Sequence, residues 1–210
     1  MKKSGIALLI VLVLGSFSNV LAIDLVGKPI FTVKGGMGIP LRGFADDSEL
    51  GADIGFGFGG DITHFVSNRI GVGICFDYSF YPLESPEGVD FSLRLFNFSA
   101  FSKYVILTNS NAIPYLKLEV GVYQPTLVLK GGGDENSSDY SMKFGFGVGG
   151  GIMFKVNDFI WVGGEAMFHD ALVKDATIGK RGSETGFDEF GYTLQYIKLN
   201  VGITFLIGNR

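Results

Sequence analysis

The feature that most constrains the fold of this 210-residue chain is an alternation of apolar and polar residues with a period of two. In residues 70–80, Ile, Val, Ile, Phe, Tyr and Phe occupy the even positions, and Gly, Gly, Cys, Asp and Ser the odd ones. Successive side chains of a β-strand point to opposite faces, so the pattern predicts a strand with one apolar and one polar face. No segment after residue 22 shows a convincing helical period, and we expect an all-β protein.

Eight segments of the chain carry this alternation. They cover residues 30–39, 52–63, 70–81, 90–103, 114–127, 142–156, 159–169 and 192–205. Strands of globular proteins usually have five or six residues, whereas a tilted strand that crosses a membrane needs about 9–11. The lengths of these segments therefore favour strands that cross a membrane.

The fourth segment changes phase along its length. Its polar residues stand at even positions first (Ser92, Arg94) and at odd positions later (Asn97, Ser99). An extra residue in a strand reverses the direction of the side chains that follow it. The phase change thus predicts a β-bulge at residues 95–96.

The connections between the segments alternate in character. The long or polar ones cover residues 40–51, 82–89, 128–141 and 170–191. The others are mostly shorter, and residues 157–158 have the length of a two-residue hairpin turn. Long loops at one end and short turns at the other are typical of outer-membrane barrels.

The first residues have the pattern of a secretory signal peptide. A basic start (residues 1–3) precedes the apolar run Ile6–Leu14, and Val20 and Ala22 fit the positions before a cleavage site. The apolar run is shorter than the roughly 20 residues that a spanning helix needs. We expect cleavage after Ala22, which leaves residues 23–210 as a single exported barrel domain.

Composition excludes several other classes of protein. Charged residues are 18% of the chain, against an average of about 25%. Glycine accounts for 32 of the 210 residues, about twice the average share of about 7%. The aromatic content of 14% is too high for a disordered chain, and the single cysteine, Cys75, cannot build a disulfide framework. A net charge of −4 gives no support to a nucleic-acid partner.

Three features indicate that the apolar face points outward, to lipid. The apolar face carries almost no charge, the opposite face consists of glycine and charged residues, and aromatic residues stand near the ends of the strands. The candidates for aromatic girdles at the membrane interfaces are Tyr78, Tyr81, Tyr104, Tyr115, Trp161, Tyr192 and Tyr196. The alternative is a secreted, soluble barrel of the lipocalin type, with its apolar face inside.

Several segments resemble the outer-membrane protein β-barrel domain family, which includes the small OmpA-type and OmpX-type barrels. They are YLKLEVGVY (115–123), KFGFGVGGGIMF (143–154) and YIKLNVGITF (196–205). The resemblance implies an eight-stranded, antiparallel, up-and-down transmembrane β-barrel, integral to a Gram-negative-type outer membrane. It also implies contact with outer-membrane lipids and lipopolysaccharide, and insertion by the barrel-assembly machinery through a terminal aromatic residue, here Phe205. We expect a monomer.

The polar face predicts a filled lumen. An eight-stranded barrel is just wide enough for side chains to fill it, and an unpaired buried charge is costly. The inward candidates are six basic and five acidic residues, nearly in balance, so we expect a network of ion pairs. They are Lys34, Arg94, Lys117, Lys143, Lys155, Lys198, Asp53, Asp61, Asp77, Glu119 and Glu165.

No motif points to catalysis, a cofactor or a metal. The glycine pattern at residues 55–60 matches a dinucleotide fingerprint, but the strand pattern continues through it where a helix should begin. His169 is followed by Asp170 and Ala171, so the Ser that a lipid A deacylase would need two residues on is missing, and we interpret His169 as a rim histidine. The favoured function is a structural or surface-interaction barrel. The alternatives are a small-solute channel and a lipid-modifying enzyme.

Overall fold

The computed structural model describes residues 25–45, 51–84, 89–106, 108, 110–131, 134–139, 142–171 and 194–207. The expected signal peptide (residues 1–22) and Tyr192 lie outside the described residues. The strands are β1 (Pro29–Leu41), β2 (Gly55–Phe65), β3 (Ile70–Leu83), β4 (Val89–Val105), β5 (Ala112–Gly131), β6 (Asp134–Asp139), β7 (Lys143–Lys155), β8 (Ile160–Ala171) and β9 (Leu194–Leu206). One short 3-10 helix, η1 (Arg42–Phe44), follows β1.

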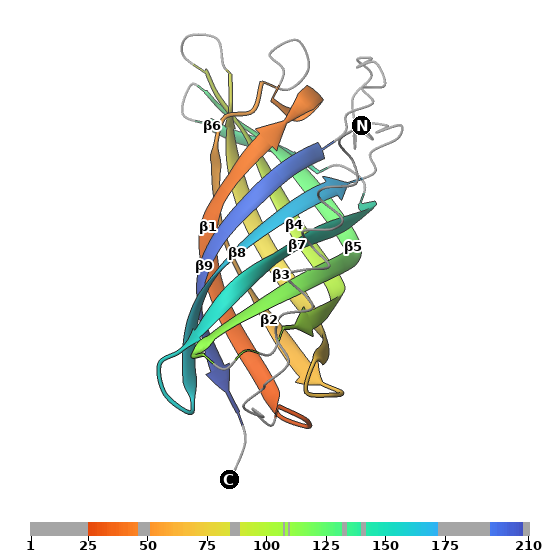
Figure 1. Ribbon diagram of the computed structural model, residues 1–210. Helices are drawn as coiled ribbons and strands as arrows, with labels where there is room; N and C mark the ends of the chain where they lie inside the picture. Colours follow the sequence, from red (N-terminus) through yellow and green to blue (C-terminus); the bar gives the residue numbers. More distant parts are fainter. Residues whose placement is uncertain are drawn as a thin grey trace, which may run out of the picture.

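Eight of these strands close into an antiparallel barrel, as predicted (Figure 1). Each of them pairs with its neighbours along the chain, and β1 pairs with β9 from Ile30–Leu206 to Leu41–Gln195 to complete the ring. The turns at residues 66–69 and 156–159 lie at the same end as the C-terminus, which we name the turn end. The opposite end, where β1 and β8 finish, is the loop end.

The ninth strand, β6, was not predicted. β6 and β7 pair with the same edge of β5, where Thr126 faces Asp139 and Tyr123 faces Lys143. β5 and β6 together extend the sheet beyond the barrel at the loop end (Figure 1).

The bulge expected at residues 95–96 is wrong. β4 pairs with β3 and β5 without interruption, and its odd-numbered residues face inward throughout, from Leu93 and Leu95 to Asn97. The polarity of the strand changes because its surroundings change. Near the loop end the barrel interior is apolar, and Arg94 stands on the outer face. The inner face of β4 is therefore apolar near the loop end and polar further along, without any extra residue in the strand.

The two faces of the barrel wall differ sharply in chemistry. Large apolar side chains stand exposed around the outside, among them Phe56, Phe58, Leu118 and Val201, which is 72% exposed. An apolar outer surface of this extent is expected for a barrel whose surroundings are hydrocarbon. Within the described ranges, no helix has the length and hydropathy that a membrane-crossing helix needs.

Candidate functional site: the filled lumen

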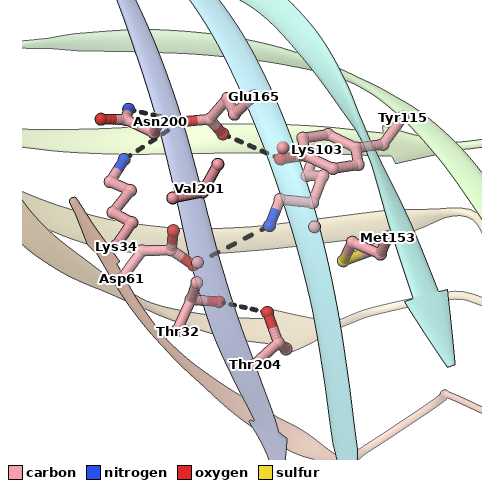
Figure 2. Close-up of a pocket in the computed structure, with 13 residues that line it drawn as sticks. Thr32, Lys34, Asp61, Lys103, Tyr115, Met153, Glu165, Asn200, Val201 and Thr204 are labelled. Carbon is pink, nitrogen blue, oxygen red and sulfur yellow. Dashed lines mark hydrogen bonds and ion pairs between the residues drawn. The ribbon is translucent and has the colours of Figure 1, made fainter. Parts of the chain in front are cut away.

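The middle of the lumen holds a layer of buried charges with no net charge. Each member faces inward because it shares the phase of the polar side of its strand. The described residues place four lysines and four carboxylates here: Lys34, Lys103, Lys117, Lys198, Asp61, Asp77, Glu119 and Glu165. We name this set the ionic layer, and Figure 2 shows the part of it around Lys34, Asp61 and Glu165.

One side of the ionic layer links three strands through Lys34. The Nζ atom of Lys34 lies 3.5 Å from Oδ2 of Asp77 and 3.2 Å from Oε1 of Glu165. Lys198 reaches the other oxygen of Asp77 at 2.8 Å. Tyr115 donates its hydroxyl proton to Oε2 of Glu165 at 3.0 Å. Charges from β1, β3, β8 and β9 are thereby neutralised in one continuous chain.

Lys117 is the centre of the other side. Its Nζ atom lies 2.7 Å from Glu119, 3.5 Å from Glu165 and 3.7 Å from Asp61. Lys103 lies 3.8 Å from Asp61, and its Nζ atom stands 4.7 Å from the centre of the Tyr115 ring. A buried charge without a partner is strongly destabilising, so the pairing lets the layer remain charged in a space without bulk water.

His169 belongs to the lumen and not to the rim, which corrects the sequence interpretation. The side chain is buried, with its Nδ1 atom 3.0 Å from the hydroxyl of Tyr123 and its ring stacked on Tyr196 at 4.8 Å between centroids. Gly147 provides the space, because a Cβ atom there would lie 3.0 Å from Nδ1 of His169. A histidine enclosed in this way is not open to a lipid substrate.

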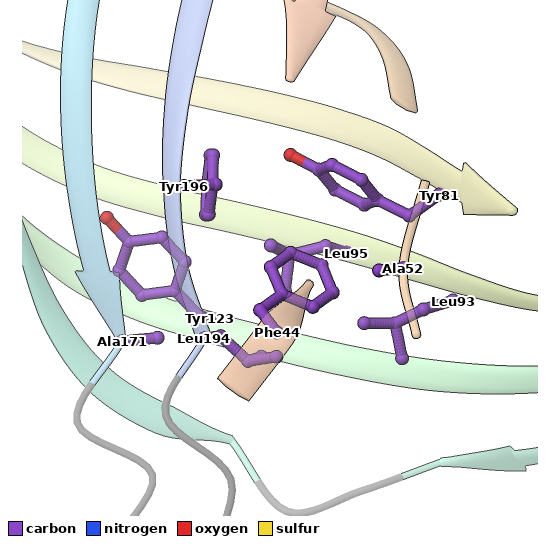
Figure 3. Close-up of a cluster of buried hydrophobic side chains, with 9 residues drawn as sticks. All are labelled: Phe44, Ala52, Tyr81, Leu93, Leu95, Tyr123, Ala171, Leu194 and Tyr196. Atoms are coloured by element: carbon purple, nitrogen blue, oxygen red, sulfur yellow. The ribbon is translucent and has the colours of Figure 1, made fainter. Parts of the chain in front are cut away.

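An aromatic cluster closes the loop end of the lumen. After β1 the chain turns inward through Arg42, whose φ is 51°, and places the buried ring of Phe44 4.8 Å from that of Tyr81 and 6.4 Å from that of Tyr196. Figure 3 shows these rings side by side. The complete cluster, the loop-end plug, is Phe44, Ala52, Tyr81, Leu93, Leu95, Tyr123, Ala171, Leu194 and Tyr196.

A second apolar cluster closes the turn end. Leu25 enters it from below β1, held by a hydrogen bond from its backbone N–H to Oδ1 of Asn68 at 3.2 Å. The cluster, the turn-end plug, is Leu25, Ile30, Phe65, Val105, Ile113, Tyr115, Met153 and Trp161. The ionic layer therefore lies between two apolar plugs.

The structure brings seven of the eleven lumen candidates into the ionic layer: Lys34, Asp61, Asp77, Lys117, Glu119, Glu165 and Lys198. The other four lie elsewhere. Arg94 stands on the outer face and Asp53 is exposed before β2. Lys143 begins β7 at the loop end, and Lys155 ends it at the turn end, 2.8 Å from Asp158.

Sequence reasoning missed Lys103, which is buried in the layer. The signal was present, because Lys103 shares its odd phase with Asn97 and Ser99 on the same strand. Its position at the end of the predicted strand, where polar residues are commonplace, hides that signal. Cys75, also buried, contacts the hydroxyl of Ser99 at 2.9 Å and Oε1 of Glu119 at 3.4 Å.

Four of the girdle candidates are wrong. Tyr81, Tyr115, Trp161 and Tyr196 are buried in the two plugs, because each has the phase of the charged residues on its own strand. Aromatic residues near strand ends fit both an outer girdle and an inner plug, and only phase separates the two. Tyr104, 39% exposed, and Tyr78, half-buried, do stand on the outer face.

The packing leaves little free space inside the ionic layer. The cavity beside Lys34, Glu165 and Asn200 measures about 20 Å³, room for about one water molecule. In the part of the chain that the structure describes, no group of three His, Cys, Asp or Glu side chains is arranged to hold a metal ion.

Comparison with solved structures decides the fold family. No family model matches the chain, and no curated protein matches it. Neisserial surface protein A matches over 86% of this chain and 97% of its own, with a TM-score of 0.54 and 16% identity. The chain has the fold of the small outer-membrane β-barrels.

Two further outer-membrane barrels support the same fold. OprG, an outer membrane protein of Pseudomonas aeruginosa, has a TM-score of 0.53 and 13% identity, and the match covers 88% of this chain and 98% of that one. Ail, the attachment invasion locus protein of Yersinia pestis, in complex with the heparin analogue sucrose octasulfate, has a TM-score of 0.52 and 13% identity over 86% and 99%.

Proposed function

We propose that this protein is an integral outer-membrane barrel that acts as a closed anchor and presents its loop end at the cell surface. The observation that carries the proposal is the three-level filling of the lumen: the loop-end plug, the ionic layer and the turn-end plug. A barrel filled in this way has its free surfaces at the lipid belt and at the loops.

The neighbours in fold support this location. They include a surface protein, an attachment invasion locus protein and an outer membrane protein. The exposed apolar belt supports contact with lipid, and the closed ring of eight strands supports our proposal that the barrel-assembly machinery inserts the protein. We propose lipopolysaccharide as the lipid neighbour at the loop end, and a monomer as the functional unit.

Membrane fractionation tests the location. The protein should sediment with the outer membrane, need detergent for extraction, and migrate differently on gels before and after boiling. Protease added to intact cells should cut in the segment 172–193 and leave the barrel strands protected. A protein that stays soluble without detergent and migrates identically in both samples would refute the proposal.

Channel activity is the main alternative, and the lumen argues against it. A pore selective for one sign of ion carries an excess of the opposite charge in its lining, whereas the ionic layer has four positive and four negative side chains. We expect no steady ohmic conductance when the purified barrel is inserted in a planar bilayer. Steady conductance at physiological salt would replace the anchor with a channel.

We also propose that the barrel is not an enzyme. The described His nearest to carboxylates, His169, is enclosed between Tyr123 and Tyr196 inside the lumen. Catalysis on a lipid needs a base that the substrate can reach. Mass spectrometry of lipid A from cells with and without the protein tests this, since an altered acyl pattern would contradict it.

A further inference from the structure

In the part of the chain that the structure describes, the outer surface of the barrel carries an open apolar groove over β1, β9 and β8. Its volume is about 860 Å³, within the range of small-molecule sites in proteins, about 300–1,000 Å³. The floor is formed by two glycines, Gly35 on β1 and Gly164 on β8, and both pair with Val201, which projects outward between them. The walls are the apolar side chains Val33, Phe154, Val162, Ile203 and Phe205.

The backbone does not require glycine at either floor position. A Cβ atom on Gly35 would have its nearest neighbour at 3.6 Å, and one on Gly164 at 3.7 Å, both ordinary van der Waals contacts. By contrast, a Cβ atom on Gly60 of the outer face of β2 would lie 2.8 Å from the carbonyl oxygen of Thr32. Glycine weakens a strand. At positions 35 and 164 an added Cβ atom would not be crowded, so packing does not explain the glycines. Their effect is the hollow on the outer surface.

The floor of the groove is a continuous wall. The same backbone separates the groove from the cavity in the ionic layer, and both are lined by Gly163, Gly164, Val201 and Gly202. The pairs Gly163–Gly202 and Gly164–Val201 join β8 to β9 without a break. The groove is therefore a depression in the surface and not a passage into the lumen.

We propose that the groove binds one acyl chain of a membrane phospholipid. The proposal rests on the membrane location proposed above. The groove is continuous with the apolar belt, and the one charged residue at its border, Lys34, directs its ammonium group into the lumen to Glu165, 3.2 Å away. A chain lying there gains van der Waals contact with the exposed Val201 and with the apolar side chains of the walls.

The position of the groove along the barrel favours a phospholipid as its occupant. The groove occupies the half of the barrel nearest the turn end, because Phe154, Val162 and Phe205 stand close to the turn-end limits of β7, β8 and β9. Short turns face the periplasm in outer-membrane barrels, so the groove lies in the periplasmic leaflet. Val201 projects from the middle of the floor, which suits a slender flexible chain better than the rigid wall of a second barrel.

Filling the groove tests the proposal, with Gly35→Leu, Gly164→Leu and the double variant. Ala100→Leu is the matched control, on the outer face of β4, which lies opposite β9 in the ring of strands. Native mass spectrometry of protein released from membranes in mild detergent should find one retained phospholipid on the wild type and on the control. The filled variants should lose it.

Trp161 supplies a second readout in vesicles. It is the one tryptophan of the chain and precedes the groove residue Val162, and its buried ring lies on the inner side of the wall, in the turn-end plug. In phosphatidylcholine vesicles with brominated acyl chains, Trp161 fluorescence should be quenched less in the filled variants than in the wild type and in Ala100→Leu. Gly35→Ala and Gly164→Ala, which add only a Cβ atom that fits, should show the same direction of change if a leucine variant fails to fold.

Three results would overturn the proposal. The first is a wild-type barrel that retains no phospholipid, and the second is a folded, filled variant with unchanged retention and quenching. The third is a wild-type dimer that filling converts to a monomer, which would make the groove a protein interface. A chain that does not float with vesicles at all would instead refute the membrane location, so the two failures are distinguishable.

Discussion

Lys198 on β9 and Asp77 on β3 meet across the lumen, with the Nζ atom of Lys198 2.8 Å from Oδ1 of Asp77. The second oxygen of Asp77 lies 3.5 Å from Nζ of Lys34. One carboxylate thus neutralises two lysines from strands that are three and two places away in the ring. Through this relationship the ionic layer ties opposite sides of the barrel together.

Asp77→Asn should destabilise the barrel by about 3–5 kcal/mol, since it leaves two buried lysines short of a partner. The free energy of unfolding is measured with denaturant in lipid vesicles, by Trp161 fluorescence. Asp158→Asn is the control, because its pair with Lys155 stands in a turn, with the Asp158 side chain 68% exposed. That change should cost no more than about 1 kcal/mol. Equal losses in the two variants would mean that the ionic layer is not a structural tie.

Lys117→Met should also cost about 3–5 kcal/mol, because three carboxylates lose their shared partner. Adding Glu119→Gln to this variant removes one of the stranded charges and should restore part of the loss. The double-mutant cycle measures the coupling between the two residues in the same unfolding assay. Additive losses would contradict a direct interaction at 2.7 Å.

Phase along the strands predicts most of the wall and the lumen from the sequence. It places Lys34, Asp61 and Glu165 on the inner face, and the same phase would have assigned Tyr196 there too. The aromatic ring of Tyr196 suits an outer girdle, but its phase predicts the inner position that the structure shows.

Two features of the lumen follow from the three-dimensional structure and not from the alternation of residues. Phe44 enters the lumen because Arg42 adopts a positive φ, and no pattern of two predicts that reversal. In β4 the inner face changes from apolar to polar along the strand, and the outer face changes the other way. Where this change occurs depends on where the membrane ends, and the alternation alone does not show that.

Gly55→Ala should destabilise the loop-end plug. The ring of Tyr81 lies against this glycine, and an added Cβ atom would stand 2.8 Å from Cε1 of the ring. Overpacking of this kind costs about 1–3 kcal/mol. Gly35→Ala is the matched control, since its Cβ atom fits. Its stability should stay within about 0.5 kcal/mol of the wild type or rise. If both variants lose the same stability, a Cβ atom is no more crowded at the inner Gly55 than at the outer Gly35, and the predicted packing difference is wrong.

Phe44→Ala should lower stability without opening a pore. Loss of a buried phenyl ring costs about 3–5 kcal/mol where the site cannot collapse. The ionic layer and the turn-end plug still fill the lumen beneath it, so planar-bilayer recordings should remain without steady conductance. Conductance in this single variant would show that the loop-end plug alone closes the barrel, and the three-level filling would not hold.

Cysteine labelling tests which residues of β4 face outward near the loop end. In a Cys75→Ser background, Arg94→Cys should react with a membrane-impermeant maleimide on intact cells, because residue 94 stands on the outer face at the loop end. Leu95→Cys, one residue further along, should stay unlabelled until the protein is unfolded, since Leu95 is buried in the loop-end plug. Labelling of both or neither on intact cells would contradict the alternation or the exposure of the loop end. Labelling of Leu95→Cys alone would restore the β-bulge that the phase change suggested.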